Sequence, residues 1–212
     1  KNVNKNHSLA IFINFTRKQL NYNKMSNLKL NLCVAACENL GIGINGNLPW
    51  HLKQELKHFS RVTTKVADPT KKNAAIMGRK TYFGIPEKKR PLPGRLNIVL
   101  SRQDDLQVPE EVIVCSSLPE ALKVLDAEQY RKEIENIWIV GGYSVYKEAM
   151  ESANCHRIYF TDIKKKIECD AFFPSIPDTF KQVPIDDDDI PSEMQEENGI
   201  KYQYLLYEKV NE

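Results

Sequence analysis

Residues 137–150 read IWIVGGYSVYKEAM and carry a clear fold signal. Ile137–Val140 is a short apolar run that predicts a buried strand, and Gly141-Gly142 interrupts it. Ser144–Met150 then has the pattern of a helix. A strand that passes into a helix through a tight glycine turn is the unit from which parallel α/β sheets are built. This stretch therefore favours an α/β fold.

The same alternation extends outward in both directions. Further apolar runs predict strands at Leu30–Cys37, Ala74–Met77, Leu96–Leu100, Val112–Cys115 and Arg157–Thr161. Helices are expected at about 52–62 and from a capping box, Ser117-Leu118-Pro119-Glu120, to about Leu125. Gly41–Asn47 is rich in turn residues, and Asn198-Gly199 joins the arms of a late hairpin. The prediction is a mixed, mainly parallel central sheet with an antiparallel C-terminal hairpin and helices on both faces.

Composition narrows the class of protein. The chain has 212 residues, enough for one core, and its 30 Lys and Arg nearly balance its 28 Asp and Glu. This balance argues against a nucleic-acid or membrane-surface protein, and no apolar run reaches the roughly 18–20 residues of a membrane span. Five cysteines without a CxxC pair predict reduced thiols and a cytoplasmic location. The four histidines lack metal-ligand spacing, so we expect no metal.

The first residues are set apart by their composition. Residues 1–24 contain no acid and are rich in Asn and Lys, which is compatible with a mitochondrial leader. Met25 is equally compatible with a true start, and this second interpretation is preferred. We therefore expect an N-terminal extension at 1–26 and one folded domain at 27–212.

The segment at 52–62 predicts an amphipathic helix that carries one acid on its apolar side. The apolar stripe comprises Leu52, Leu56, Phe59 and Val62. Glu55 falls within that stripe, whereas His58 and the cations lie on the other side. Such a carboxylate needs an internal partner, such as a Thr hydroxyl or an Arg, or a bound ligand. The rigid Leu48-Pro49-Trp50 entry to the helix favours the ligand.

Polar and glycine residues follow four of the predicted strands. They are Arg79 and Lys80, Ser101 and Arg102, Ser116 and Ser117, and Gly141-Gly142. Ligands of open α/β sheets bind beyond the carboxyl ends of the strands, and this set suits a dinucleotide with an extra phosphate. Ordinary turn chemistry explains each pair taken alone. Arg95 also has two alternative interpretations: it is a surface charge, or it binds a substrate carboxylate through two hydrogen bonds.

Taken together, the motifs resemble those of dihydrofolate reductase of the animal, single-function type, over about Leu30–Lys209. The segments that carry the resemblance are Gly41–Trp50, Ile76–Thr81, Pro86–Asn97, Val99–Arg102 and Trp138–Tyr146. The resemblance implies NADPH as cofactor, dihydrofolate as substrate and antifolates as inhibitors. It also implies a cis bond between Gly141 and Gly142 and a mobile flap over Gly41–Leu48.

Roles for individual residues follow from the same resemblance. The implied catalytic residues are Glu55, Trp50, Leu48, Thr161 and Tyr146. The implied substrate-binding residues are Cys33, Val34, Glu55, Leu56, Phe59, Ile85, Leu92, Arg95 and Val140. The implied cofactor-binding residues are Ala35, Ile42, Gly46, Arg79, Lys80, Thr81, Ser101, Arg102, Ser117, Val140, Gly142, Tyr143, Ser144, Val145 and Tyr146.

Two other functions stay open at this point. A reductase of riboflavin synthesis shares the fold and the cofactor, but is not expected to combine Leu48-Pro49-Trp50, Glu55 and Arg95. A non-catalytic RNA-binding module on the same fold is disfavoured by the near-neutral charge. A monomer is expected because the sequence shows no obvious interface patch.

Overall fold

The structure, a computed structural model, describes residues 28–210 and is built on a nine-stranded sheet. The expectation for residues 1–26 lies outside this range. Neighbouring strands follow the order β10-β11-β7-β1-β6-β3-β4-β5, and β9 pairs with β11. Their bounds are β1 Leu30–Cys37, β3 Lys72–Gly78, β4 Arg95–Leu100, β5 Ile113–Cys115, β6 Ile134–Ile139, β7 Cys155–Ile163, β9 Phe180–Val183, β10 Gln195–Glu197 and β11 Ile200–Lys209.

The strand directions confirm the predicted fold class. All pairs from β7 through β1, β6, β3 and β4 to β5 are parallel. The three pairs that involve β11 are antiparallel. Asn198 and Gly199 join β10 to β11, both with positive φ (54° and 71°), which is the geometry of a tight hairpin turn.

Two cores lie on opposite faces of the sheet, and the pleat divides the strand residues between them. On β1, Leu30, Leu32 and Val34 face one core, whereas Cys33 and Cys37 face the other. The middle of the sheet is buried on both sides, which explains why its strands are continuous apolar runs.

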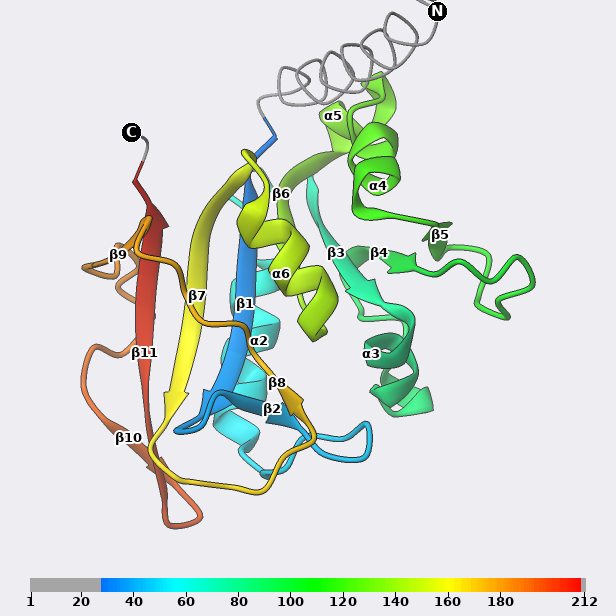
Figure 1. The fold of residues 1–212 in the computed structure, drawn as a ribbon. Coiled ribbons are helices and arrows are strands. Elements are labelled where there is room, and N and C mark those ends of the chain that lie inside the picture. The colour runs from blue at the N-terminus through cyan, green and yellow to red at the C-terminus, as the bar shows by residue number, and fades with distance from the viewer. Residues whose placement is uncertain (1–27, 211–212) are drawn as a thin grey trace, which may run out of the picture.

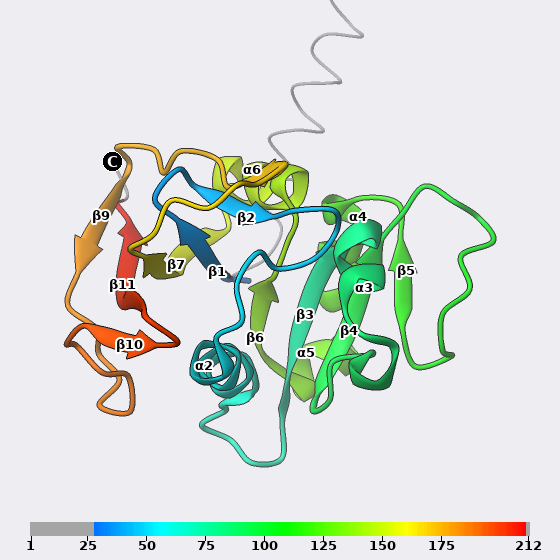
Figure 2. The same ribbon diagram turned by 90° about the horizontal axis from the view of Figure 1, so that it is seen from below.

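Helices cover both faces, as Figures 1 and 2 show. The helices are α2 Lys53–Thr64, α3 Arg79–Gly84, α4 Leu118–Leu125, α5 Glu128–Glu133 and α6 Tyr143–Glu151, with a 3₁₀ turn at Glu87–Lys89. Side chains of α4 and α6 pack into the first core, and side chains of α2 and α3 pack into the second. No helix within residues 28–210 is both long and apolar enough to cross a bilayer.

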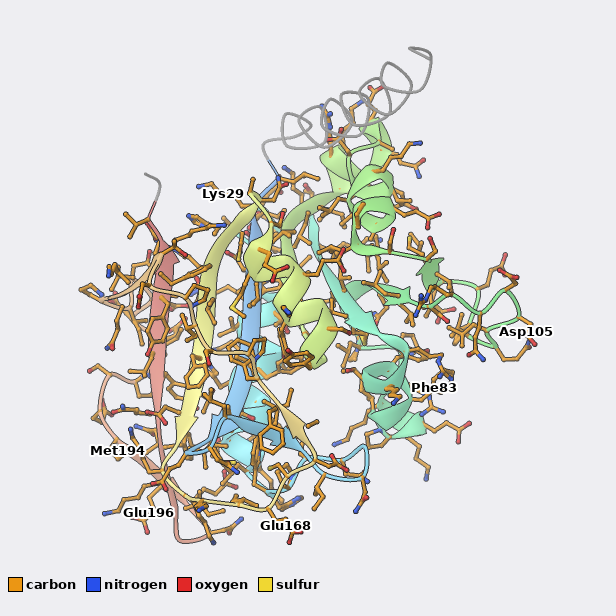
Figure 3. The ribbon with its side chains drawn as sticks, viewed as in Figure 1. Lys29, Phe83, Asp105, Glu168, Met194 and Glu196 are labelled. Carbon is orange, nitrogen blue, oxygen red and sulfur yellow. The ribbon has the colours of Figure 1, made fainter. Side chains whose placement is uncertain are left out.

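The structure departs from the sequence prediction in several loops. The turn-rich segment contains a short strand, β2 Gly41–Gly43, which pairs with β8 Ala171–Phe172 as a separate two-stranded sheet. Ser117 caps α4 as predicted, and its Oγ accepts from the Glu120 amide at 3.3 Å. The Glu120 carboxylate bonds the Ser116 amide and hydroxyl, one residue further back than a capping box requires. The loop between β4 and β5 extends away from the sheet, with Asp105 near its tip (Figure 3).

Candidate active site

Glu55 is a buried acid in the first turn of α2, with 5% of its surface exposed. The Thr161 hydroxyl, from β7, donates a hydrogen bond to Glu55 Oε1 at 3.2 Å. Burial raises the Glu55 pKa from 4.5 to about 7, and the Thr161 hydrogen bond opposes part of that rise. A carboxyl group with a pKa near neutrality and one neutral protein partner is suited to hold a ligand through hydrogen bonds.

The surroundings of Glu55 are apolar and partly open. Trp50 is buried, and no acceptor among the described residues bonds its indole Nε1. Leu48 and Leu56 are 49% and 38% exposed, although both are large apolar side chains. The apolar stripe predicted a buried Leu56, so this expectation is wrong for that residue. Large exposed apolar side chains on and just before the helix that carries a buried acid are typical of a ligand-binding site.

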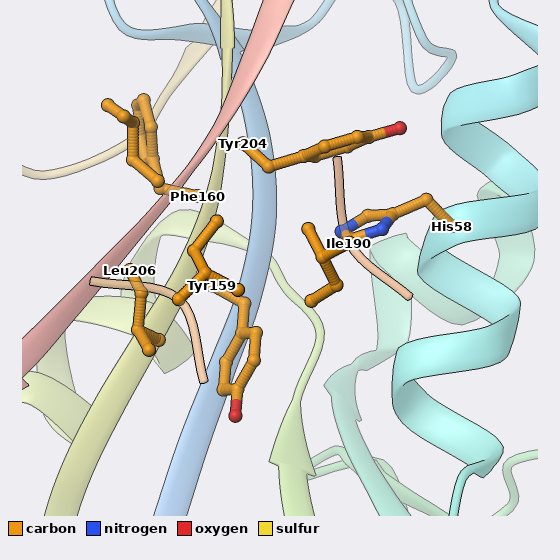
Figure 4. A pocket seen from close by; sticks show the side chains of 8 residues that line it. His58, Tyr159, Phe160, Ile190, Tyr204 and Leu206 are labelled. Carbon is orange, nitrogen blue, oxygen red and sulfur yellow. The ribbon is translucent and has the colours of Figure 1, made fainter. Parts of the chain in front are cut away.

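His58 corrects a second detail of the helix prediction, because it is buried and does not face solvent. Its ring stacks on Tyr204 with 3.8 Å between centroids. Figure 4 shows this stack beside Ile190 and Tyr159, a closely packed contact between α2 and the sheet. Burial is the main cause that lowers the His58 pKa to about 4, and the nearby Arg61 adds to it. His58 is therefore neutral at physiological pH.

The middle of β1 and helix α6 meet near Glu55. The Tyr146 hydroxyl donates to the Cys33 carbonyl at 2.8 Å, and both residues are buried. Val34 is also buried, whereas Ala35 is half-buried and pairs in register with Thr161. Cys33 and Ala35 thus lie on the α2 side of the sheet, whereas Val34 lies in the opposite core and Tyr146 reaches β1 through its hydrogen bond to Cys33.

Arg95 lies at the start of β4 and is buried, so its interpretation as a surface charge is wrong. Its Nη1 donates to Thr63 Oγ1 at 2.6 Å and its Nε donates to the Pro93 carbonyl at 3.0 Å. The guanidinium also lies over the Phe59 ring, 5.7 Å from its centroid. Within residues 28–210 it forms no ion pair. A buried guanidinium held by neutral partners is suited to an anionic ligand.

The four predicted strand ends lie at the same edge of the sheet, because β6, β3, β4 and β5 are parallel neighbours. Arg79, Lys80 and Arg102 are exposed there, and Ser101 and Ser117 are half-buried. Two of these residues, Ser101 and Ser117, also form hydrogen bonds with nearby backbone amides. Ser101 Oγ accepts from the Gln103 amide at 3.1 Å, and Ser117 caps α4.

Gly141 and Gly142 follow β6 and lie at the same edge of the sheet. Their peptide bond is cis, as the resemblance implied. The Gly78 amide donates to the Gly141 carbonyl at 2.7 Å, which joins the ends of β3 and β6. A Cβ at either glycine would lie 3.2–3.3 Å from the Thr81 side chain. Helix α6 begins directly afterwards at Tyr143, with Ser144 exposed and Val145 buried.

The Gly41–Leu48 segment runs from β2 towards α3. The Asn45 amide donates to Asp170 Oδ2 at 2.8 Å, which holds the segment on one side. At Gly84, the end of α3, a Cβ would lie 2.5 Å from the Gly46 carbonyl oxygen. Ile42 is half-buried and Gly46 is exposed. The segment therefore spans from the sheet to the last turn of α3, and Figure 2 shows its path.

Sequence reasoning missed two polar residues that place the predicted ones. Thr63 holds Arg95, and its hydroxyl also donates to the Phe59 carbonyl at 2.7 Å. Asn97 bonds both the amide and the carbonyl of Leu92 at 2.9 Å. Asn97 was visible in the sequence as the last residue of a motif that carries the resemblance and as a polar residue inside an apolar strand, whereas Thr63 gave no signal. Ile85 and Leu92 are half-buried, and Val140 is buried, beside the same core.

Within residues 28–210, no group of three or more His, Cys, Asp or Glu side chains is arranged to bind a metal ion. All five cysteines are unpaired thiols in the structure.

Comparison with known proteins identifies the family. The family model "Dihydrofolate reductase" matches residues 29–209. The dihydrofolate reductase of Aedes albopictus is 62% identical and that of Drosophila melanogaster 57%, each over 86% of this chain and 98% of the relative. The solved structure of Schistosoma mansoni dihydrofolate reductase aligns with a TM-score of 0.77 at 39% identity, covering 87% of this chain and 100% of that one. With nearly the whole described chain matched in sequence and in fold, this protein belongs to the dihydrofolate reductase family.

Proposed function

We propose that this protein reduces 7,8-dihydrofolate to 5,6,7,8-tetrahydrofolate with NADPH, and that Glu55 holds the pterin ring for the reaction. NADPH-dependent reduction of dihydrofolate is the known function of the family. The observation that carries the proposal for individual residues is the buried Glu55 carboxyl, whose bonded partner in residues 28–210 is a neutral hydroxyl.

Glu55 matches the donor edge of a pterin. The 2-amino group and N3–H of the ring lie side by side, and a carboxylate accepts a hydrogen bond from both. Such bonds favour the ionised acid, so substrate binding lowers the raised Glu55 pKa towards its ordinary value. The acid fixes the ring and tunes its basicity, while the proton that N5 receives comes from water.

The neighbouring residues hold and shield the ring. Thr161 orients the acid through its hydrogen bond, and the unpaired indole N–H of Trp50 is a donor for an ordered water. Leu56 supplies apolar contact from α2, and Leu48 supplies it from the segment before the helix. These side chains exclude bulk water from the reacting face, which strengthens each polar contact inside.

Arg95 suits the carboxylate of the substrate's glutamate tail. Its two observed hydrogen bonds go to neutral oxygens, so its positive charge is not neutralised by an acid of the described chain. A bidentate carboxylate offers the paired geometry that a guanidinium prefers. Phe59, Ile85 and Leu92 then line the path between the ring and the tail.

The strand ends fit NADPH by their chemistry. Arg79, Ser101 and Arg102 are suited to the 2′-phosphate, and neither arginine forms an ion pair within residues 28–210. The lack of side chains at Gly141-Gly142 leaves the backbone there accessible beside Thr81, where a Cβ would be crowded. The residues that would hold the remainder of the dinucleotide are Ala35, Ile42, Gly46, Lys80, Thr81, Ser117, Val140, Gly142, Tyr143, Ser144, Val145 and Tyr146. When bound, NADPH supplies the hydride that reduces C6 of the pterin.

The activity assay follows the loss of NADPH absorbance with dihydrofolate present. Glu55→Gln and Glu55→Ala are expected to lower turnover at neutral pH by roughly 10²-fold or more, because the ring loses its anionic anchor. Turnover close to that of the wild type in both variants would refute the role of Glu55.

The phosphate assignment has its own test. Arg79→Ala and Arg102→Ala are expected to raise KM for NADPH far more than KM for NADH, which lacks the 2′-phosphate. Lys181→Ala removes an exposed cation from β9, away from the strand ends, and serves as the matched control. Equal effects on both cofactors contradict the assignment.

The proposal also includes inhibition by antifolates, a monomeric state and a cytoplasmic location. The five free thiols support a reducing compartment. Titration with an antifolate, light scattering and cell fractionation test these three points.

A further inference from the structure

The start of α2 is held by side chains from the C-terminal hairpin. The Lys53 amide donates to Glu197 Oε1 and the Gln54 amide donates to Glu197 Oε2, both at 2.8 Å. Asn198, the next residue of the hairpin, donates from Nδ2 to the His51 carbonyl at 2.8 Å. Three hydrogen bonds therefore join the β10–β11 turn to the residues that lead into the helix.

This contact replaces a cap that the helix lacks. Leu52, the residue at the N-cap position, has an extended backbone and no side chain that bonds the helix amides. Glu55 is the third residue of α2, the position from which a Glu side chain reaches back to the helix N-terminus in a capping box. In the structure Glu55 bonds Thr161 and faces the candidate site, while Glu197 accepts from the helix amides.

We propose that Glu197 is a positioning residue for the reductase reaction: by capping α2 from β10, it leaves the Glu55 carboxyl directed at the pterin. The inference rests on the proposed role of Glu55. Glu197 touches neither substrate nor cofactor in this proposal, and it acts through the helix that carries the acid.

The charge of Glu197 also influences the protonation of Glu55. Glu197 is held ionised, because its bonds to the helix amides lower its pKa. The titratable groups that face Glu55 are Cys33 of β1, Tyr146 of α6, Tyr202 and Tyr204 of β11, and Glu197 of β10. Burial raises the pKa of the thiol and of the three phenols, so these four are neutral near pH 7. Glu197 is thus the charged neighbour in this set, and its charge favours protonation of Glu55.

The decisive experiment compares Glu197→Gln with wild type in two measurements. The first is the pH dependence of kcat/KM for dihydrofolate. The second is the pKa of the Glu55 carboxyl in the ligand-free protein, read by carbon NMR and assigned with Glu55→Gln. Removing the charge and uncovering the helix amides both favour ionised Glu55, so its pKa falls by roughly half a unit. Looser placement of the acid lowers kcat/KM roughly tenfold.

Glu196 provides a matched control on the same strand. It is exposed and lies at the outer edge of the molecule (Figure 3), so Glu196→Gln removes the same charge without touching α2. This control is expected to leave kcat/KM and the Glu55 pKa as in wild type. Glu197→Asp keeps the charge on a shorter side chain and is expected to restore part of both properties.

The possible outcomes separate a failure of the inference about Glu197 from a failure of the proposed role of Glu55. A Glu55 pKa unchanged in folded Glu197→Gln, or changed equally in Glu196→Gln, overturns the inference about Glu197. If Glu55→Gln itself has normal turnover, the proposed role of Glu55 fails first. Reduced kcat/KM with an unshifted Glu55 pKa assigns Glu197 a purely structural role, which also contradicts the inference.

Discussion

Replacing Glu55 by Gln is expected to make the ligand-free protein more stable at high pH, at the expense of activity. The folded chain raises the Glu55 pKa from 4.5 to about 7. Between these values the folded state binds a proton that the unfolded state does not, so stability rises as pH falls from 7 to 4.5. Above pH 7 both states are ionised, and the buried charge costs about 3.4 kcal/mol at about 1.4 kcal/mol per pKa unit.

Because Gln carries no charge, it removes this cost. At pH 8 nearly the whole cost is present, whereas about 0.8 kcal/mol remains at pH 5. The free energy of unfolding of Glu55→Gln, minus that of wild type, is therefore expected to be about 2.5 kcal/mol larger at pH 8 than at pH 5. Any constant cost of placing an amide beside Thr161 cancels in that comparison.

Urea denaturation of the ligand-free proteins at both pH values provides the measurement, with equal m-values required. Every other titrating group is present in both proteins, so its contribution also cancels. A difference between variant and wild type that is the same at pH 5 and pH 8, within about 0.5 kcal/mol, would show that Glu55 is not held in a desolvated site.

Two further changes test the packing. His58→Phe keeps a ring on Tyr204 but removes a group whose pKa is lowered to about 4. Between pH 6.5 and 4 the unfolded wild type binds a proton at His58 that the folded state does not, which lowers the stability of the wild type. In urea denaturation, the free energy of unfolding of His58→Phe, minus that of wild type, is therefore expected to be about 2 kcal/mol larger at pH 5 than at pH 8. A pH-independent difference contradicts this. Gly41→Ala would place a Cβ 2.3 Å from Cys169 Sγ, so a loss of roughly 1–3 kcal/mol is expected in thermal unfolding. Gly43→Ala, with its nearest neighbour at 3.3 Å, is the control, and an equal loss in both variants argues against the clash.

The sheet could be predicted where burial on both faces dictates composition. Leu30–Cys37 is an uninterrupted apolar run, and β1 has those same bounds. In contrast, β8 and β9 have two and four residues and no periodicity of their own. Their partners, β2 and β11, are distant in sequence, so tertiary contacts decide whether these residues form strands.

The site was predictable where one residue broke a local pattern. Glu55 on an apolar stripe signalled a special environment, and the resemblance added Thr161 as a catalytic residue. Helical spacing failed for His58 because β11 supplies a ring, Tyr204, that covers the opposite side of α2. Burial of Arg95 likewise depends on Thr63, 32 residues earlier in the chain, a contact that no local pattern encodes.

The hairpin contact has a consequence for synthesis of the chain. Glu197 is translated 144 residues after Lys53, whose amide it accepts. At bacterial to eukaryotic elongation rates, the ribosome needs roughly 7–30 s to make that stretch. Throughout this interval the nascent α2 lacks its remote cap, so the acid at its third position is held in its working orientation only after the β10–β11 hairpin has emerged. The orientation of the acid is thereby coupled to synthesis of that hairpin.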